Sequence, residues 1–181
     1  YGVRHSHGAF AWLLNDDVFV NPGVAAPLLE NFETHSIAAV THTLRYPDGK
    51  IQYAGKYRPR GAVGFGHLDY KLKSSRHVNP VEQESLCGAS MMIRRAAFFD
   101  VDGFDERYRL YSEDDDLAMK LRQAGWSIMF DPRAEGIHEE HQSVNITAGW
   151  RDYLNASSVK FREKWGGYFV KNPDPHILGK F

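Results

Sequence analysis

Short apolar runs alternate along the chain with segments whose apolar residues recur at helical spacing. The run Phe10–Leu14 is apolar throughout and ends abruptly in polar residues, which predicts a buried strand of a parallel sheet. Ile37–Val40 and Trp126–Phe130 predict further strands, and Leu86–Ile93 has the same apolar character interrupted by Gly88.

Helices are predicted between these runs. Ser112 is expected as an N-cap, and Asp115 three residues later resembles a capping box. The residues after Gly166 are expected to be irregular because Pro173 and Pro175 follow. The predicted helices are Pro22–Glu33, Arg94–Val101, Ser112–Gly125 and Thr147–Trp165.

A hairpin and a long loop complete the pattern. The turn signal Pro47-Asp48-Gly49 separates Leu44–Tyr46 from Ile51–Tyr53, which predicts two short antiparallel strands. Ala54–Pro80 is rich in glycine and is expected to be a long, partly mobile loop of the kind that covers a site. Strands alternating with helices predict an α/β fold, with residues 1–181 forming a single domain.

Composition narrows the classes of function. The chain has 181 residues, of which 43% are hydrophobic, so one domain with a buried core is expected. The net charge is -1 and the basic residues are scattered, which argues against a nucleic-acid partner. No apolar run approaches ~18 residues, so no transmembrane segment is predicted. Cys87, the single cysteine, is interpreted as a buried core residue.

Two acidic clusters are candidates for chemistry. Asn15-Asp16-Asp17 follows a predicted strand, where open α/β sheets bind ligands, and Mg²⁺ or Mn²⁺ binds carboxylate oxygens together with substrate phosphates. The alternative is a polar turn that ends the strand. The second cluster, Glu113-Asp114-Asp115-Asp116, begins a predicted helix. One acid is enough for capping, so four indicate a cation or proton-transfer site, although a solvated helix start stays open.

Two weaker candidates accompany these clusters. His138 and His141 follow the strand Trp126–Phe130, and imidazole is both a metal ligand and an acid–base group, but a surface histidine without function is equally compatible. Gly88 and Ala89 lie in an apolar segment, where a glycine often marks the close approach of a ligand or of another backbone. Packing explains them equally well.

Taken in order, these motifs resemble glycosyltransferase family 2, which has the GT-A fold. The resemblance covers about Gly8 to Trp165. The segments that carry it are Trp12–Val18, Pro22-Gly23, Tyr46–Gly55, Cys87–Arg95, Gly103–Glu106, Tyr111–Leu117, Gly125-Trp126 and His138.

The resemblance assigns roles to the candidate residues. It implies a metal ion, Mg²⁺ or Mn²⁺, at Asp17 and His138. Asp114 would be the catalytic base, and Glu113 would orient the acceptor or the base. The remaining residues, which would contact the donor sugar and its diphosphate, are Asn15, Asp16, Gly88 and Ala89.

The implied function is a metal-assisted, inverting transfer of a sugar from a nucleotide-diphosphate donor to an acceptor hydroxyl, as hexosyl- or deoxyhexosyl-transferases perform. The acceptor would be a saccharide or a lipid-linked saccharide in the synthesis of cell-surface polysaccharide or glycan. The resemblance implies a cytoplasmic location at the inner face of the plasma membrane, with peripheral association. A non-catalytic GT-A-like scaffold and a related nucleotidyltransferase are the alternatives.

The implied fold is a GT-A-like mixed sheet flanked by helices. The family's first strand–helix units normally precede the strand that ends in Asn15-Asp16-Asp17, but only 14 residues precede Asn15 here. The resemblance therefore implies the C-terminal part of such a catalytic domain, lacking the first strand–helix units, with an unpaired sheet edge.

Overall fold

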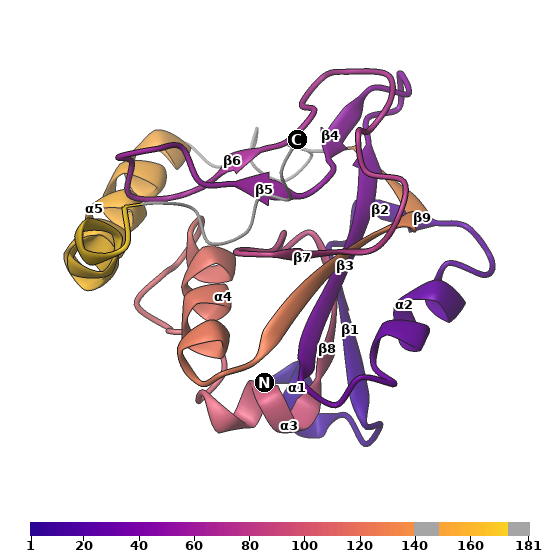
Figure 1. The fold of residues 1–181 in the computed structure, drawn as a ribbon, viewed down its shortest axis with the longest axis horizontal. Coiled ribbons are helices and arrows are strands. Elements are labelled where there is room, and N and C mark those ends of the chain that lie inside the picture. The colour runs from indigo at the N-terminus through magenta and orange to yellow at the C-terminus, as the bar shows by residue number, and fades with distance from the viewer. Residues whose placement is uncertain (140–148, 174–181) are drawn as a thin grey trace.

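The computed structural model describes residues 1–139 and 149–173, and it shows a mixed sheet flanked by helices (Figure 1). The seven-stranded sheet has the order β1-β8-β3-β9-β2, with β4 paired to β3 and β7 paired to β9. In the described ranges, β3 and β9 are parallel and the other pairs of this sheet are antiparallel. The strands are β1 (Phe10–Leu14), β2 (Val18–Val20), β3 (Ile37–Arg45), β4 (Ile51–Tyr53), β7 (Val81–Gln83), β8 (Ser90–Arg94) and β9 (Ser127–His138).

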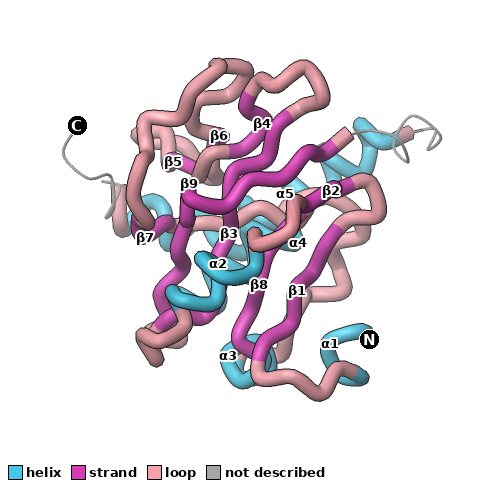
Figure 2. Tube along the Cα trace, turned by 90° about the vertical axis from the view of Figure 1, so that its right-hand side faces the viewer, coloured by secondary structure: helices cyan, strands magenta, loops and turns pink. Residues whose placement is uncertain are grey.

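Side chains that alternate along the strands build a core on each face of the sheet. Val40 and Met92 pack towards helix α2, whereas Ala39 and Ile93 pack towards α3 and α4. Figure 2 shows α2 lying across its face and β1 at the sheet's edge. The helices are α1 (Gly2–His5), α2 (Ala25–Asn31), α3 (Arg95–Asp100), α4 (Glu113–Gln123) and α5 (Trp150–Lys171).

Strand β1 has the predicted bounds, but its pairing and burial differ from the prediction. It pairs antiparallel with β8 and lies at the end of the sheet order, and its residues are half-buried or exposed. The expectation of a buried strand in a parallel sheet is therefore wrong. The pairing of Leu14 with Ser90 has a consequence for the site, because it brings Asn15 beside Ala89.

Strand β9 runs well past its predicted end at Phe130. Its pairing with β3 passes from Asp131 opposite His42 to Glu135 opposite Thr43, so the residues between them, which include Pro132, form a bulge. The strand then continues beside β2, where His138 lies opposite Val18. Pro132 ends the apolar run but not the strand. Beyond the bulge, the strand places His138 beside Asp17.

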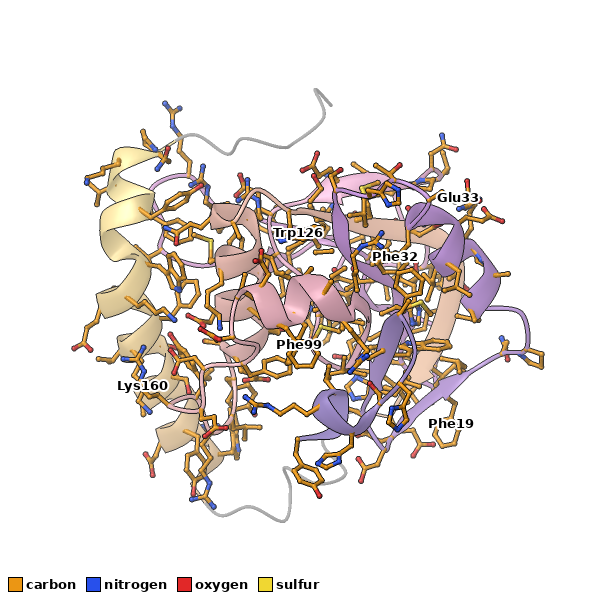
Figure 3. The ribbon with its side chains drawn as sticks, turned by 90° about the horizontal axis from the view of Figure 1, so that it is seen from below. Phe19, Phe32, Glu33, Phe99, Trp126 and Lys160 are labelled. Atoms are coloured by element: carbon orange, nitrogen blue, oxygen red, sulfur yellow. The ribbon has the colours of Figure 1, made fainter. Side chains whose placement is uncertain are left out.

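Two further predictions need correction. Ala54–Pro80 contains β5 (Lys56–Tyr57) and β6 (Gly66–His67), which pair as a two-stranded sheet, and its predicted mobility stays a prediction. The helix predicted to end at Trp165 continues to Lys171, because Trp165 and Phe169 are buried against α4 and the 54–80 segment. Figure 3 shows α5 standing beside α4 at one side of the molecule.

Candidate active site

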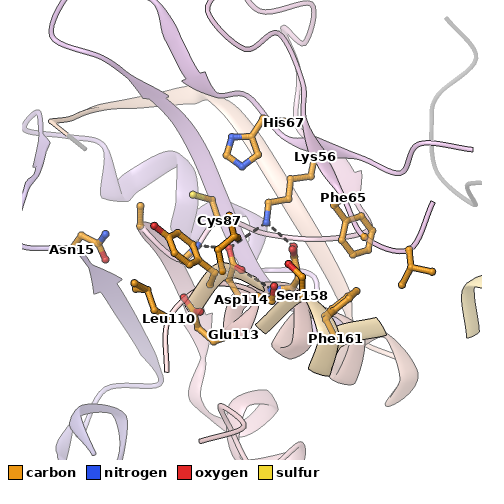
Figure 4. Close-up of a pocket in the computed structure, with 18 of the residues that line it drawn as sticks. Asn15, Lys56, Phe65, His67, Cys87, Leu110, Glu113, Asp114, Ser158 and Phe161 are labelled. Carbon is orange, nitrogen blue, oxygen red and sulfur yellow. Dashed lines mark hydrogen bonds and ion pairs between the residues drawn. The ribbon is translucent and has the colours of Figure 1, made fainter. Parts of the chain in front are cut away.

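A cleft of about 750 Å³ lies where the ends of several elements meet (Figure 4). Its walls come from the segment after β1, from β5 and the loop that follows it, from the turn before β8, from the start of α4, from the end of β9 and from α5. It is lined by all the residues to which the resemblance assigns roles, which are Asn15, Asp16, Asp17, Gly88, Ala89, Glu113, Asp114 and His138.

Asp17 and His138 meet at one end of this cleft. His138 Nε2 lies 3.0 Å from Asp17 Oδ1, and both side chains are largely buried. On its other side, His138 Nδ1 lies 2.6 Å from Oε1 of Gln52, to which the sequence assigned no role. With the Gln52 amide in this orientation, Nδ1 donates its hydrogen to Oε1, and Nε2 is the ring nitrogen that faces Asp17.

This arrangement fits a divalent cation. Asp17 Oδ1 is buried and accepts no hydrogen bond, so its contact with His138 becomes favourable when a proton or a cation lies between the two atoms. One carboxylate and one imidazole suit Mn²⁺ or Mg²⁺ when substrate phosphates supply the other ligands. Across the described ranges, no group of three or more His, Cys, Asp and Glu side chains forms a metal site, so the protein alone does not complete the coordination.

The turn before β8 connects the two acidic clusters. Ala89 O accepts a hydrogen bond from the Asn15 backbone at 2.9 Å, and the Gly88 backbone donates to Asp114 Oδ2 at 3.0 Å. A Cβ at position 88 would lie 3.3 Å from Asp114 Cβ. Gly88 therefore lies before β8 and not within a strand as predicted, and its lack of a side chain permits the close approach of Asp114.

The four acids that begin α4 point in two directions. Glu113, Asp114 and Asp115 line the cleft, whereas Asp116 is fully buried away from it. Asp116 Oδ1 accepts a hydrogen bond from Trp165 Nε1 at 2.8 Å and lies 2.7 Å from Lys164 Nζ. Asp116 thus attaches α5 to α4, and three acids are left for chemistry.

The predicted capping box is absent. Ser112 precedes α4 in a left-handed conformation with φ 63° and makes no side-chain cap bond. Asp115 instead accepts hydrogen bonds from Ser85 and from Lys56, whose Nζ lies 2.6 Å from Asp115 Oδ1. The sequence spacing of Ser112 and Asp115 was a chance match, because residues distant in sequence take the Asp115 carboxylate.

Lys56 is a second site residue that the sequence did not reveal. Its Nζ lies 3.2 Å from Asp114 Oδ2 as well as contacting Asp115, and its side chain is 5% exposed. Burial alone would lower the pKa of Lys56, but the charges of Asp114 and Asp115 outweigh it and raise that pKa. A lysine in a weak sheet segment carries no sequence signal for such a role.

The three cleft carboxyls differ in their affinity for protons. Burial raises the pKa of Asp114, but the Lys56 ammonium and the Gly88 and Asp115 backbone N–H groups outweigh it, so that pKa is lowered overall. Burial, together with the charge of Asp114, raises the pKa of Glu113 to about 7. For Asp115, burial raises the pKa by more than Lys56 lowers it, even though Lys56 lies closer to Asp115 than to Asp114. Asp114 is consequently the carboxyl that ionises first.

The opposite end of the cleft is largely apolar. Its walls combine Val63 and Phe65 of the 54–80 segment with Leu154 and Phe161 of α5, and Phe65 packs edge-on against Phe161. Arg162 adds an exposed cation on the same helix. An amphiphilic wall of this kind suits a sugar ring or a lipid chain.

Cys87 and His141 are the remaining residues that the sequence raised. Cys87 lies at the cleft wall, is 8% exposed and forms no disulfide, as the core interpretation predicts. Burial raises the pKa of its thiol to about 12, so it is not a nucleophile at neutral pH. His141 lies outside the described residues.

Comparison with known proteins identifies the family of this chain. Residues 1–166 match the model of the glycosyltransferase-like family 2. The chain belongs to glycosyltransferase family 2. The predicted family is thereby confirmed.

Several curated proteins are similar to this member of family 2. An N-acetylglucosaminyl-diphospho-decaprenol L-rhamnosyltransferase of Mycobacterium tuberculosis is 32% identical over 152 residues, which cover 74% of this chain and 48% of that protein. The O-antigen biosynthesis protein RfbC of Myxococcus xanthus is 26% identical over 157 residues, covering 82% of this chain and 12% of its own length. This chain thus spans about half the length of the first relative and less of the second.

A solved structure confirms the predicted fold. GalNAc-T7, crystallised with UDP, GalNAc and Mn²⁺, superposes with a TM-score of 0.58 at 16% identity, over 76% of this chain and 29% of that one. The fold is therefore GT-A, with the mixed sheet and flanking helices that the sequence predicts. Among the described helices, none is long and apolar enough to cross a membrane.

Proposed function

We propose that this chain carries the metal-binding and catalytic residues of an inverting glycosyltransferase. The enzyme would transfer a sugar from a nucleoside-diphosphate donor to a hydroxyl of a saccharide or lipid-linked saccharide during polysaccharide synthesis. Family membership supports glycosyl transfer, and the names of the rhamnosyltransferase and O-antigen relatives favour a deoxyhexose donor and a cell-surface product.

The observation that carries this proposal is the placement of two unlike acidic sites in one cleft. The Asp17–His138 pair lies at the end of β1 and β9, and Asp114 lies at the start of α4, with the Gly88-Ala89 turn joining them. A transfer reaction needs both, because one site binds the departing diphosphate while the other takes a proton from the incoming hydroxyl.

The donor's diphosphate would bind at Asp17 and His138, with Asn15 and Asp16 beside them. A divalent cation held there supplies electrostatic stabilisation of the leaving nucleoside diphosphate. Gln52 fixes the His138 ring, so the imidazole needs no reorganisation when donor binds. The solved GalNAc-T7 complex contains UDP and Mn²⁺, which is compatible with this assignment on the same fold.

Asp114 would act as the base. Its side chain is 16% exposed. Oδ2 accepts from Gly88 and Lys56, whereas Oδ1 accepts only from the Asp115 backbone and so keeps a lone pair for the proton. The acceptor's oxygen would attack the anomeric carbon as its proton passes to Asp114, and the bond to the diphosphate breaks on the opposite face. That geometry inverts the configuration. Glu113, whose Oε2 is buried without a hydrogen-bond partner, would orient the acceptor.

The test uses the complete encoded protein with Mn²⁺ or Mg²⁺ and a panel of nucleotide sugars that includes activated rhamnose. Sugar transfer should occur with one donor, should stop on chelation, and should give a product of inverted anomeric configuration by NMR. Donor binding without transfer to any acceptor would favour the scaffold alternative. Release of pyrophosphate from a nucleoside triphosphate would favour the nucleotidyltransferase.

A further inference from the structure

The Lys56 ammonium is a buried cation among three carboxyls. It contacts Asp114 and Asp115, and Glu113 is close enough for the Lys56 charge to lower its pKa against the opposing effect of burial. Surface lysine pairs contribute little, but removing one partner of a buried pair is costly because the other charge is left uncompensated. The position of Lys56 therefore decides how charge is distributed in this part of the cleft.

The backbone around Lys56 holds it in place. Its N–H donates to Gln83 Oε1 at 3.0 Å, and β5 pairs Lys56 with His67. The preceding Gly55 has φ 97°, and a Cβ there would lie 3.0 Å from Gln83 Oε1. These contacts bring the strand close enough to α4 for the ammonium to reach both carboxylates (Figure 4).

We propose that Lys56 is a positioning residue for glycosyl transfer, which keeps the Asp114 carboxylate ionised and directed into the cleft. The inference rests on the proposed role of Asp114 as the base. Asp115 completes the arrangement: it holds the ammonium from the far side and is itself held by Ser85. Lys56 touches neither donor nor acceptor in this assignment, and it acts through Asp114.

Two other roles make different predictions. A lysine that only stabilises the fold would affect unfolding and leave the proton affinity of the base unchanged. A lysine that binds the donor's diphosphate directly would affect donor binding most. The geometry favours positioning, because two of the three N–H groups of the ammonium are directed at Asp114 and Asp115.

The test compares Lys56→Met and Lys56→Arg with Lys164→Met in the complete encoded protein. Lys164 is a matched control, because it pairs with Asp116 in the same acidic run but outside the cleft. We measure kcat and donor KM across a pH series, and thermal unfolding shows which variants are folded.

Positioning predicts that Lys56→Met lowers kcat by about 10²-fold, within the range for general-base catalysis. Without the ammonium the pKa of Asp114 rises, so the acidic limb of the kcat/KM profile should move to higher pH by about one unit or more. Donor KM should change less than about threefold. Lys56→Arg retains the positive charge and should keep the acidic limb, and Lys164→Met should behave as wild type in both respects.

An unmoved acidic limb in a folded Lys56→Met variant would overturn the proposal, as would a loss confined to donor KM. If Lys56→Met does not fold, the pH profile of Lys56→Arg decides the question. An acidic limb that moves by about one pH unit or more in Lys56→Arg, although the positive charge is retained, would also contradict the proposal. Absence of transfer by the wild-type protein with every donor would instead count against the proposed function, so the two failures are distinguishable.

Discussion

The two acidic segments of the cleft are alike in sequence and opposite in environment. In Asn15-Asp16-Asp17, Asp16 is exposed and the buried Asp17 Oδ1 lies beside His138 without accepting a hydrogen bond, so the segment can accept further positive charge. In the run from Glu113 to Asp116, the protein provides its own cations, Lys56 and Lys164. The first segment can take a metal ion, and the second is already neutralised in part.

This difference separates the proposed roles. A carboxylate that is to bind a metal must lack a permanent partner, whereas a base must be ionised before substrate arrives and must not bind the metal itself. Asp17 meets the first requirement and Asp114 the second. The comparison therefore predicts that substitutions in the two segments have different effects.

The largest effect is expected from Asp114→Asn. The amide cannot accept the acceptor's proton, so kcat should fall by about 10²–10⁴-fold, measured as sugar transfer at saturating donor. Asp116→Asn, two residues further in the same run, is the control. Its transfer rate per folded molecule should stay within about threefold of wild type. Equal losses of transfer rate in the two variants would contradict the assignment of Asp114 to catalysis and of Asp116 to attaching α5.

Asp116→Ala should have the largest effect on stability. It leaves the Trp165 N–H without its buried acceptor and Lys164 without one of its partners. We expect the free energy of unfolding to fall by about 3 kcal/mol in urea titrations, the lower end of the range for buried pairs because Lys164 is partly exposed. Asp48→Asn removes an exposed pair with Lys50 instead and should leave the free energy of unfolding nearly unchanged.

Gln52→Ala tests the proposed metal site at Asp17 and His138. Without the contact to Nδ1, the His138 ring is no longer oriented, and Mn²⁺ affinity in the presence of nucleoside diphosphate should fall by about 10–100-fold in calorimetry. Gln83→Ala also removes a buried amide, one that holds Lys56 instead, and should leave Mn²⁺ affinity unchanged. Unchanged Mn²⁺ affinity in Gln52→Ala would contradict the view that Gln52 orients His138 to bind a metal ion with Asp17.

A smaller effect concerns pH and Glu113. Its pKa is raised from 4.5 to about 7, so the folded state binds this proton more tightly than the unfolded state does. Its contribution to stability is therefore present below about pH 4.5 and is lost as pH rises towards 7. In metal-free buffer, Glu113→Gln should gain about 2 kcal/mol over wild type across that window. Exposed Glu163→Gln should show no such trend, and parallel curves for Glu113→Gln and wild type would contradict the assigned environment.

The parts of the fold that the sequence predicts are those with a local signal. The apolar runs locate β1 and the core of β3, and the turn signal locates the β3–β4 hairpin, although not the register shift between Leu44 and Arg45. Strands β2 and β7 have three residues each, too few for a periodic pattern. Helix α5 continues through two glycines because buried Trp165 and Phe169 outweigh their low helix propensity, an effect of tertiary packing.

The same distinction applies to the site. Asp17, Glu113, Asp114 and His138 occur in motifs that a family resemblance exposes, and all four line the cleft. Lys56 lies outside the segments that carry the resemblance, and Gln52 lies in one of them, Tyr46–Gly55, without a role assigned to it. Their importance comes from the atoms they contact 58 and 86 residues away. The orientation of Asp116 away from the cleft was hidden for the same reason, since its partners are on α5.

Calorimetry of donor binding tests the central claim most directly, with Asp17→Asn and Asp114→Asn compared in the complete encoded protein. Our account predicts that Asp114→Asn binds a nucleotide sugar with Mn²⁺ as wild type does while its transfer rate falls by about 10²-fold or more. It also predicts that Asp17→Asn loses the Mn²⁺-dependent part of binding. Equal, metal-dependent donor binding by both variants would contradict the assignment of metal and base to the two segments.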